Sequence, residues 1–361
     1  MSTPRIYIGL DIHKKTYRVH IDTDICHHKN FSMSADIELL YEYVQKHFAA
    51  HEVHLVYEIG CCGFGVARYC LNLGWHVMVV NPSDIPRSDK YQYQKSDKID
   101  ARMLCRLYRD GQLKGIHIPT EQEDLLKLLL RHRNILVRNL RRIKNQIKSQ
   151  LLYMSISVPE EYDNATWSKA FIEWIRAIRW QSSEGALSME SKLVVLECLH
   201  KEFLHIINEL AKYYRTHHKE DYYLLRSIPG FGRLVVSAIL SELGDIRRFT
   251  NESELSNYIG VVPGLHSSGG TEKALGITPR CRSLLRSYII EAAWIAMRRD
   301  PELQAYYRKH QGKNSKSVIV KIAHKLIRRM WSVIRNKQPY IINYQDSLEN
   351  STKSGKVKQT A

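Results

Sequence analysis

The stretch RIYIGLDIHKKTYRVHID, residues Arg5–Asp22, indicates how the first part of this chain folds. Apolar side chains alternate with other residues from Ile6 to Leu10, which is the period-two pattern of a strand, and a carboxylate follows at Asp11. A second strand is predicted over Thr16–Asp22, after a short polar break. The chain is therefore predicted to begin with strands, the first of which ends in an acid.

Working outward from this start, strand and helix patterns alternate over the first hundred residues. The predicted elements are a possible third strand near His28–Ser32, a helix over Ile37–Phe48, strands over His54–Glu58 and Trp75–Val80, and between these two a helix over Phe64–Leu73. The peptide Asn81-Pro82-Ser83 breaks the last strand. This order predicts an α/β sandwich with helices on both faces of the sheet.

The pattern changes after Pro119. No glycine or proline occurs from Leu125 to Leu152, and apolar residues at 129, 136, 140, 143, 147 and 151 follow helical spacing. This spacing predicts one long helix with a seam like that of a coiled coil. A second helical stretch, Leu187–His218, is predicted to return antiparallel to the first.

The long helix is strongly basic. No acidic residue lies between positions 131 and 148, whereas an exposed helix usually mixes both signs for i,i+4 pairs. The cations are Arg131, Arg133, Arg138, Arg141, Arg142, Lys144 and Lys148. We interpret the run as a phosphate-binding face, and the alternative is a basic exposed face without a ligand.

Composition supports a polyanionic partner. The 361 residues carry 54 Lys and Arg against 37 Asp and Glu, so the formal charge is +17 and nucleic acid is the expected partner. A hydrophobic fraction of 44% excludes a wholly disordered chain. No uncharged apolar run reaches 18 residues, so no membrane-spanning helix is predicted. Seven cysteines without C-x-x-C spacing, and a start unlike a signal peptide, predict reduced thiols in a cytoplasmic protein.

Four acids in the first hundred residues form a candidate metal site. Asp11 and Glu58 end predicted strands, and Asp97 and Asp100 are spaced i,i+3, which places both on one face of a helix. Hard cations such as Mg²⁺ prefer carboxylate oxygens, and two such ions can position the oxygens of a phosphoryl transfer. Taken singly, each acid is more commonly a turn former or a helix cap.

Five segments resemble one known family. YIGLDIHKK (Tyr7–Lys15), VYEIGCCGFG (Val56–Gly65) and KSDKIDARMLCRL (Lys95–Leu107) resemble the three DEDD-motif blocks of insertion-sequence-110 transposases, a family that includes Piv-type DNA invertases. LLRSIPGFGRLVVSAILSELGDIRRF (Leu224–Phe249) and YIGVVPGLHSSGG (Tyr258–Gly270) resemble its C-terminal transposase domain. The resemblance covers most of residues 5–335.

The resemblance implies a domain order and a set of partners. Residues 1–119 are expected to form a RuvC-like, ribonuclease-H-like domain, in which the four acids bind Mg²⁺. The resemblance also implies a C-terminal transposase domain over residues 221–340. Helical spacing, rather than the resemblance, predicts the helical coiled-coil region over residues 120–220, and polar composition without apolar periodicity predicts a disordered tail over residues 341–361. The implied partners are donor and target DNA, a structured bridge RNA encoded by the same element, and further copies of the chain in a dimer or tetramer located at the bacterial nucleoid.

The family's C-terminal domain supplies a serine that attacks the scissile phosphate. Ser268 fits its Ser-Gly pattern, because two glycines follow it and small residues let a DNA backbone approach. Ser267 is a direct competitor. A serine needs activation by a base or a metal, and no histidine has diagnostic spacing for that role.

Two further features of this domain suggest phosphate contacts. The peptide Ser227–Gly232 resembles the hairpin of a helix-hairpin-helix motif, in which Gly230 and Gly232 expose N–H groups at a helix start. An ordinary helix–helix turn explains the same residues. Downstream, the planar guanidinium groups of Arg280, Arg282 and Arg286 suit bidentate phosphate binding.

The predicted function is that of a DNA transposase, a site-specific recombinase that cuts and rejoins strands through a phosphoserine link. Such a link conserves phosphodiester energy, and the sequence has no G-x-x-x-x-G-K-[ST] loop for ATP. One alternative is a metal-dependent, junction-resolvase-like nuclease that uses water. The other is a non-catalytic nucleic-acid-binding protein with structural acids.

Overall fold

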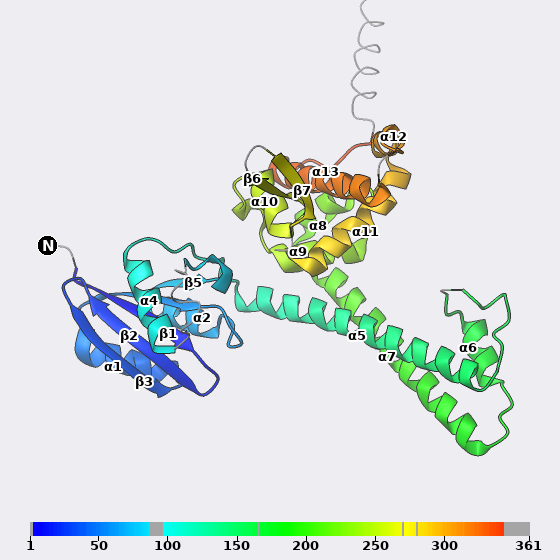
Figure 1. Cartoon of the computed structure of the whole chain (residues 1–361), viewed down its shortest axis with the longest axis horizontal. Coiled ribbons are helices and arrows are strands. Elements are labelled where there is room, and N and C mark those ends of the chain that lie inside the picture. Colours follow the sequence, from blue (N-terminus) through cyan, green and yellow to red (C-terminus); the bar gives the residue numbers. More distant parts are fainter. Residues whose placement is uncertain are drawn as a thin grey trace, which may run out of the picture. The chain divides into compact units, whose positions relative to one another are not determined.

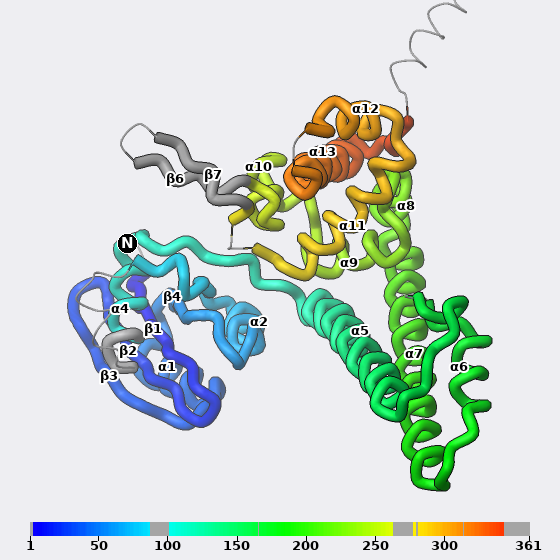
Figure 2. The backbone as a smooth tube through the Cα atoms, turned by 45° about the vertical axis from the view of Figure 1, so that its right-hand side comes forward, coloured from blue at the N-terminus to red at the C-terminus, as the bar shows by residue number. Residues whose placement is uncertain are grey.

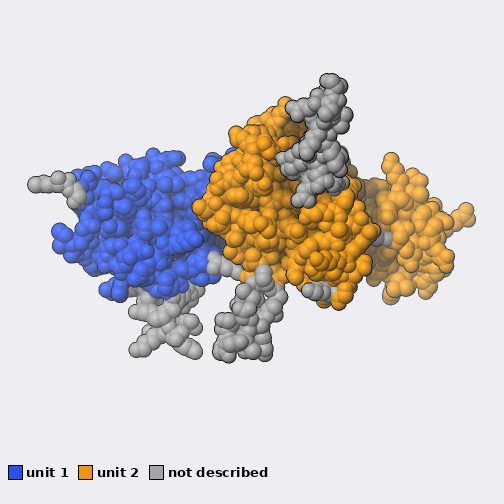
Figure 3. Space-filling view, turned by 90° about the horizontal axis from the view of Figure 1, so that it is seen from above, with its two compact units in different colours: residues 1–122 blue, residues 123–361 orange. Residues whose placement is uncertain are grey.

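The structure is a computed structural model that describes residues 3–86, 97–164, 166–268, 271–278, 281–312 and 314–342. The chain divides into two compact units, residues 1–122 and 123–361 (Figure 3). Each unit contains its own hydrophobic core. The further division expected near residue 220 stays a prediction.

The first unit is built on a five-stranded sheet with the strand order β3-β2-β1-β4-β5 (Figure 1). The strands are β1 (Arg5–Ile12), β2 (Thr16–Thr23), β3 (His27–Ser34), β4 (Glu52–Glu58) and β5 (His76–Val80). The first three strands pair antiparallel, whereas β4 runs parallel to β1 and β5 runs parallel to β4. The mixed sheet therefore joins a meander to two parallel strands.

Helices cover both faces of this sheet, as the sequence predicts. Helices α1 (Ile37–Phe48) and α2 (Gly65–Asn72) share a core with alternate residues of β1, among them Ile6, Ile8 and Leu10. Helix α4 (Asp97–Arg109) packs on the opposite face, where Leu104 joins Val56 and Val80. A short 3₁₀ turn, Pro82–Asp84, follows β5. The α/β prediction for this unit is confirmed.

The predicted ends of these elements lie within about two residues of the observed ones, and local signals explain the agreement. Helix α1 begins after Asp36, whose side chain accepts a hydrogen bond from the Glu38 backbone N–H at 2.9 Å. This is the usual role of an aspartate at a helix N-cap, where it satisfies a free N–H donor. The possible third strand near His28–Ser32 is present as β3.

Gly9 lets α4 approach β1 very closely. A Cβ atom at this position would lie 2.0 Å from the Ala101 carbonyl oxygen and 2.8 Å from the Cys105 nitrogen, both of which are backbone atoms of α4. The Cys105 thiol donates to the Tyr7 carbonyl oxygen at 3.2 Å, and burial raises the pKa of this thiol to about 12, so that it keeps its proton. A helix backbone therefore lies directly on a strand backbone.

Gly9→Ala is expected to destabilise the first unit by about 3 kcal/mol, because the added methyl group meets backbone that cannot rotate away. Amide hydrogen exchange of β1 peptides in the full chain measures the effect as lost protection. Gly65→Ala is the matched control, since nothing lies within 4 Å of a Cβ at that position. Equal protection in the two variants would contradict the close packing of α4.

The second unit begins with two long helices. Helices α5 (Glu121–Tyr153) and α7 (Ser183–His217) run antiparallel and side by side, and α6 (Lys169–Arg176) packs near their far end (Figure 2). Apolar residues from all three helices form one core cluster, in which Ile147, Phe171 and Leu193 are fully buried. The predicted long helices are present. The coiled-coil packing of these helices stays a prediction.

The rest of this unit is a helical bundle with one hairpin. Its elements are α8 (Lys219–Arg226), α9 (Arg233–Leu243), a 3₁₀ turn (Ile246–Arg248), α10 (Glu252–Ile259), β6 (Pro263–Ser268), β7 (Thr271–Ile277), α11 (Ser283–Arg299), α12 (Pro301–Lys309) and α13 (Ser315–Asn336). Leu130 of α5 and Leu210 of α7 belong to the bundle core. The base of the long hairpin is therefore anchored in the bundle.

A buried acid holds the end of the bundle together. Asp300 is 1% exposed, and its Oδ2 accepts hydrogen bonds from Arg329 Nη1 at 2.9 Å and from the Tyr340 hydroxyl at 2.8 Å. Its Oδ1 accepts from the Leu303 N–H at the start of α12. One carboxylate thus connects α12, α13 and the segment that follows α13.

Three other expectations concern the cysteines, membrane-spanning helices and the tail. All seven cysteines are free thiols. Among the residues that the structure describes, no helix is long and apolar enough to cross a membrane. The tail predicted to be disordered lies outside the described residues from position 343 onward.

Candidate active site and nucleic-acid contacts

Asp11 and Glu58 lie next to each other at one edge of the sheet. In the parallel pair of β1 and β4, Leu10 pairs with Tyr57, so the two acids are the next residues of adjacent strands. The Asp11 side chain is 20% exposed, and its Oδ2 lies 3.2 Å from His13 Nε2. The parallel register therefore brings together two acids that lie far apart in the sequence.

Both acids belong to the face of the sheet that α4 covers. Side chains alternate between the faces of a strand, so Asp11 shares the face of Gly9, and Glu58 shares the face of Val56. Gly9 faces the backbone of α4, and Val56 packs with Leu104 of that helix. The two strand-end carboxylates consequently point toward the α4 side.

The direction of α4 brings its first turn to the same edge. Along α4, Ala101 lies over Gly9, and eight residues later Arg109 reaches Asp22, which pairs with Tyr7 at the start of β1. The helix therefore runs antiparallel to β1. Four helical residues and two strand residues each span about 6 Å, so the helix start lies level with the end of β1.

Asp97 and Asp100 occupy this first turn of α4, although the structure does not describe their side chains. The backbone thus brings three elements that carry all four predicted acids to one edge of the sheet. The four predicted ligands are all carboxylates, and carboxylate oxygens suit a hard divalent cation. Transition metals favour sites that also contain imidazole or thiolate donors.

The predicted nucleophile lies in the second unit, on the β6–β7 hairpin. Ser268 is the last residue of β6 and pairs with Thr271, and Ser267 pairs with Glu272. The structure does not describe the side chains of the two serines, and Gly269 and Gly270 between the strands lie outside the described residues. Backbone register therefore places both serines at the tip of a two-stranded hairpin.

Arg286 forms hydrogen bonds with the backbone at both ends of this hairpin. Its Nη1 donates to the carbonyl oxygens of Gly260 at 3.2 Å and Thr278 at 2.9 Å, which lie just before β6 and just after β7. Arg282 stacks over the Tyr258 ring, with its Cζ 4.9 Å from the ring centroid. The predicted phosphate ligand Arg280 lies outside the described residues.

The helix-hairpin-helix-like turn is tightly packed at Gly230. This residue has a φ of +87°, and a Cβ there would lie 2.3 Å from the Ala292 carbonyl oxygen of α11. Gly232 is only partly buried and precedes α9 without a side-chain cap. Close packing between helices accounts for Gly230, whereas the free N–H groups at the start of α9 remain compatible with phosphate binding.

Four of the seven cations on α5 have partners inside the protein. Arg133 is 9% exposed, donates to the Tyr288 hydroxyl at 2.8 Å and lies over the Phe203 ring. The three others are Arg131, which lies 3.6 Å from Glu242, Lys148, which lies 3.7 Å from Asp163, and Lys144, which lies over Trp167. Burial lowers the pKa of Lys144. Arg133 is directed inward rather than toward solvent.

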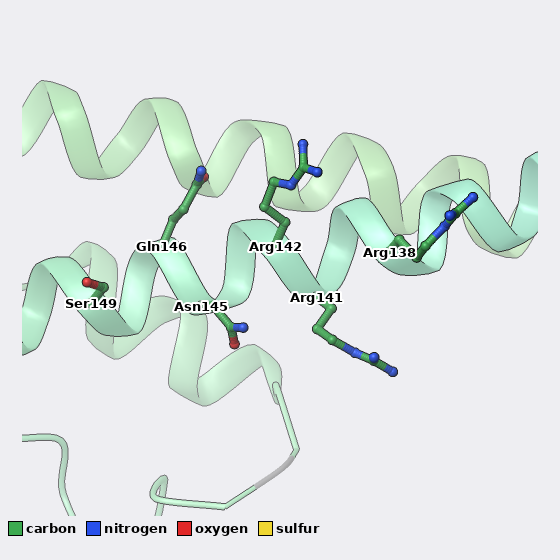
Figure 4. Close-up of a pocket in the computed structure, with 6 residues that line it drawn as sticks. All are labelled: Arg138, Arg141, Arg142, Asn145, Gln146 and Ser149. Carbon is green, nitrogen blue, oxygen red and sulfur yellow. The ribbon is translucent and has the colours of Figure 1, made fainter.

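The other three arginines form an exposed set, which we call the α5 arginine face. Arg138, Arg141 and Arg142 are exposed, and none of them has an acidic partner among the described residues. Together with Asn145, Gln146 and Ser149 they line an open depression. Figure 4 shows Arg141 and Arg142 extending from the helix in opposite directions. Unpaired arginines beside amide side chains suit contacts with phosphate and sugar oxygens.

Sequence reasoning missed two histidine–carboxylate clusters in the first unit. One contains Glu52, His54 and His76, and the other contains His20, Asp22 and His27. The sequence shows part of each cluster, because Glu52 and His54, like His20 and Asp22, are spaced i,i+2 on a strand, which puts both side chains on one face. The third member comes from a neighbouring strand, so that the pairing register is needed to find it.

Two family models match parts of this chain. The DEDD-type IS110 transposase family model matches residues 8–155, and the model described as "Transposase IS116/IS110/IS902 family" matches residues 222–308. The first match spans the strand-end acids and α4, and the second spans the hairpin and the packed turn. A DEDD transposase family implies the use of a divalent metal.

Several relatives are similar to this chain over most of their length. The putative transposase y4qE of Sinorhizobium fredii is 26% identical over 310 residues, which cover 78% of this chain and 75% of the relative. The transposase of insertion sequence IS1533 from Leptospira borgpetersenii is 25% identical over 93% of this chain and 97% of its own. The pilin gene-inverting protein of Moraxella lacunata is 25% identical over 93% and 98%.

The two family matches lie in the expected order, and the relatives are named as transposases or as a DNA-inverting protein. The acids that the sheet and α4 bring together fall within the first match. This chain therefore belongs to the IS110 family of transposases and is a DNA recombinase enzyme.

Proposed function

We propose that this protein is a Mg²⁺-dependent site-specific recombinase that cuts DNA strands and rejoins them through a serine. The observation that carries the proposal is the convergence of β1, β4 and the first turn of α4, which brings Asp11, Glu58, Asp97 and Asp100 to one edge of the sheet. Strand-end acids on a mixed sheet also support a RuvC-like fold for this unit.

The four acids would hold the metal. Divalent ions bound there supply charge stabilisation for the phosphate and help to activate the attacking oxygen. Because the four proposed ligands are all carboxylates, Mg²⁺ is favoured over zinc. The role of the protein is to fix the carboxylates on strand ends and on a helix that cannot shift without breaking the contact at Gly9.

Ser268 is the proposed nucleophile. Its Oγ–P bond forms as one phosphodiester P–O bond of the DNA breaks, so that the energy of the broken bond is kept for rejoining. Arg286 acts as a positioning residue, because it holds both ends of the hairpin that carries the serine. The proposal requires this hairpin to reach the acids of the same subunit or of a neighbouring one.

The function is tested with the full chain and DNA that carries the ends of its own element, with and without the bridge RNA. We expect sealed recombinant junctions in Mg²⁺, loss of all cleavage after chelation with EDTA, and recovery on adding Mg²⁺ back. Junction-specific amplification and gel analysis of nicks measure the products. Sealed junctions formed at the same rate in EDTA would overturn the metal proposal.

The α5 arginine face is the proposed contact for nucleic acid, and we favour the structured bridge RNA as its ligand. The face carries three unpaired positive charges on one long helix, which suits an extended phosphate backbone. Recognition of backbone and shape leaves sequence choice to base pairing, as in other RNA-guided systems. Nucleic acid that copurifies with the chain should therefore be sensitive to ribonuclease.

Replacing Arg138, Arg141 and Arg142 together by glutamine is expected to weaken RNA binding and to reduce the slope of log K against log salt concentration. Each lost phosphate contact lowers the slope by about 0.7–0.9, so a reduction of about 2–3 is expected for the three. Filter binding over a salt series measures it for RNA and for DNA separately.

The matched control removes three exposed lysines from other helices, Lys201, Lys212 and Lys309, so that net charge changes equally. It should leave the slope nearly unchanged. An unchanged slope in the arginine variant would contradict the proposed face, and a change for DNA alone would replace RNA by DNA as its ligand.

Self-association is also part of the proposal, because recombination must hold two duplexes at once. Each long helix carries an exposed apolar pair spaced seven residues apart, Leu128 and Ile135 on α5, and Leu187 and Val194 on α7. Such heptad spacing suits helix–helix contact between subunits. We expect a dimer or tetramer that acts on DNA of the bacterial nucleoid.

A further inference from the structure

A second group of potential ligands lies on the α4 face of the sheet, at the edge opposite the four acids. Glu52 and His54 are two residues apart on β4, so they share one face of the strand. His76 of β5 pairs directly with His54 across the parallel ladder. The pairing register of β4 and β5 thus brings two imidazoles and one carboxylate close together.

The three side chains converge on one point. Glu52 Oε1 lies 3.1 Å from His54 Nε2 and 2.9 Å from His76 Nε2. All three potential ligand atoms lie within 4.8 Å of one another. The two imidazole rings are nearly parallel, with an interplanar angle of 14° and centroids 4.7 Å apart. For comparison, ligand atoms in a tetrahedral zinc site with bonds of about 2.0–2.1 Å are separated by roughly 3.3 Å.

The nitrogen that points into this cluster faces the carboxylate. His54 Nε2 is buried and lies 3.1 Å from Glu52 Oε1. An imidazole nitrogen and a carboxylate oxygen are thus held at about the separation of two ligands of one tetrahedral ion. A bound cation would use this lone pair and the facing carboxylate oxygen.

Residues outside the cluster contact the far sides of the His54 and Glu52 side chains. The Tyr108 hydroxyl of α4 lies 3.5 Å from His54 Nδ1, and Arg5 Nε donates to Glu52 Oε2 at 3.1 Å. Groups that contact the far side of a ligand fix its orientation, and this arrangement is usual around metal-binding histidines. The Tyr7 ring stacks on His54 from the neighbouring strand.

We propose that Glu52, His54 and His76 form a binding site for a transition-metal cation of the Zn²⁺ class, separate from the Mg²⁺ site of the four acids. The ligand atoms are Glu52 Oε1, His54 Nε2 and His76 Nε2. The His76 side chain is 57% exposed, which leaves an open side for entry of the ion and for a fourth ligand from water. Two imidazoles in the donor set favour Zn²⁺ over Mg²⁺. The ion ties β4 to β5 at this edge of the sheet.

The cluster of His20, Asp22 and His27 has similar spacing but is more closed to solvent. Asp22 Oδ1 lies 3.0 Å from both histidines. The His20 and Asp22 side chains are 3% and 10% exposed, against 16% and 29% for His54 and Glu52, so that less space is open for entry of an ion. This cluster therefore serves as the internal comparison for the experiment.

The test is Co²⁺ binding to the untagged full chain in a large excess of Mg²⁺, which occupies the acid edge. We expect one equivalent of Co²⁺ with the visible absorption of a nitrogen- and oxygen-ligated tetrahedral or five-coordinate ion, displaced by Zn²⁺. His76→Ala should lower the affinity for this Co²⁺ ion by about 100-fold or more, and Glu52→Gln should lower it by a similar factor. Hydrogen exchange of β4 and β5 peptides should slow on adding Zn²⁺ in the original protein and not in His76→Ala.

Two variants serve as controls. His47→Ala removes an exposed histidine of α1 outside both clusters, and His27→Ala disrupts the comparison cluster. Both should keep the Co²⁺ equivalent, and all variants should show the same far-ultraviolet dichroism without metal. Loss of the equivalent in His27→Ala but not in His76→Ala would overturn the proposal. So would equal Co²⁺ affinity in His76→Ala and the original chain.

Discussion

Asp11→Ala is expected to abolish DNA strand cleavage while leaving nucleic-acid binding largely intact. The reason is that Asp11 adjoins Glu58 at the ends of paired parallel strands, so its loss removes a ligand from the centre of the proposed metal site. Several kcal/mol of charge stabilisation correspond to a fall in rate of at least about a thousandfold. Gel analysis of cleaved and nicked DNA under single-turnover conditions measures the rate.

The comparison for this variant is Glu42→Ala, which removes an exposed carboxylate of α1 from the same unit. It changes net charge by the same amount and should cleave at the original rate. Cleavage by Asp11→Ala at a rate similar to that of Glu42→Ala would rule out the acid edge as the active site. Normal binding with lost cleavage in Asp11→Ala would argue against a non-catalytic nucleic-acid-binding protein.

Ser268→Ala is expected to abolish covalent capture of DNA by the protein. The proposed intermediate joins Ser268 Oγ to the scissile phosphate, and alanine offers no oxygen for that bond. The predicted loss is complete within detection, because the change removes the nucleophile rather than weakening an interaction. Denaturing gels of labelled DNA, followed by protease treatment, measure the covalent species.

Ser267→Ala is the matched control, because it removes the same hydroxyl group one residue earlier on the same strand. It should retain covalent capture. The reverse result, with capture lost in Ser267→Ala and kept in Ser268→Ala, would make the choice of serine wrong while the mechanism survives. If Ser268→Ala and Ser267→Ala both cleave DNA at the original rate and no covalent species forms even in the original chain, water is the nucleophile and the protein is a resolvase-like nuclease.

Local patterns were sufficient to predict most of the elements in the first unit. Strand alternation from Ile6 to Leu10 depends only on neighbouring residues, and so does the helix that begins after Asp36. The long α5 follows from an unbroken apolar period without glycine or proline. These features are decided by backbone propensity and by which face must be buried, both of which are encoded within one segment.

The candidate site was predictable only in part. The sequence pattern identified Asp11 and Glu58 as strand-end acids, and the resemblance to the family added the serine. That the two acids are neighbours depends on the parallel register of β1 and β4, which no single segment contains. The first turn of α4 lies beside the end of β1 because Gly9 contacts Ala101, a residue distant from it in the sequence.

By itself, then, the sequence determined the order of strands and helices, the strongly basic character of α5 and the membership of the first unit in the α/β class. Only the tertiary structure decided which α5 cations face solvent. Arg133 and Arg138 look alike in the sequence, yet Arg133 is buried against Tyr288, which follows it by 155 residues, while Arg138 is exposed. The pairing of His54 with His76 across two strands was likewise decided by register. The physical reason is the same in both cases: propensity acts between residues close along the chain, whereas burial and ligand geometry depend on groups that meet only when the chain has folded.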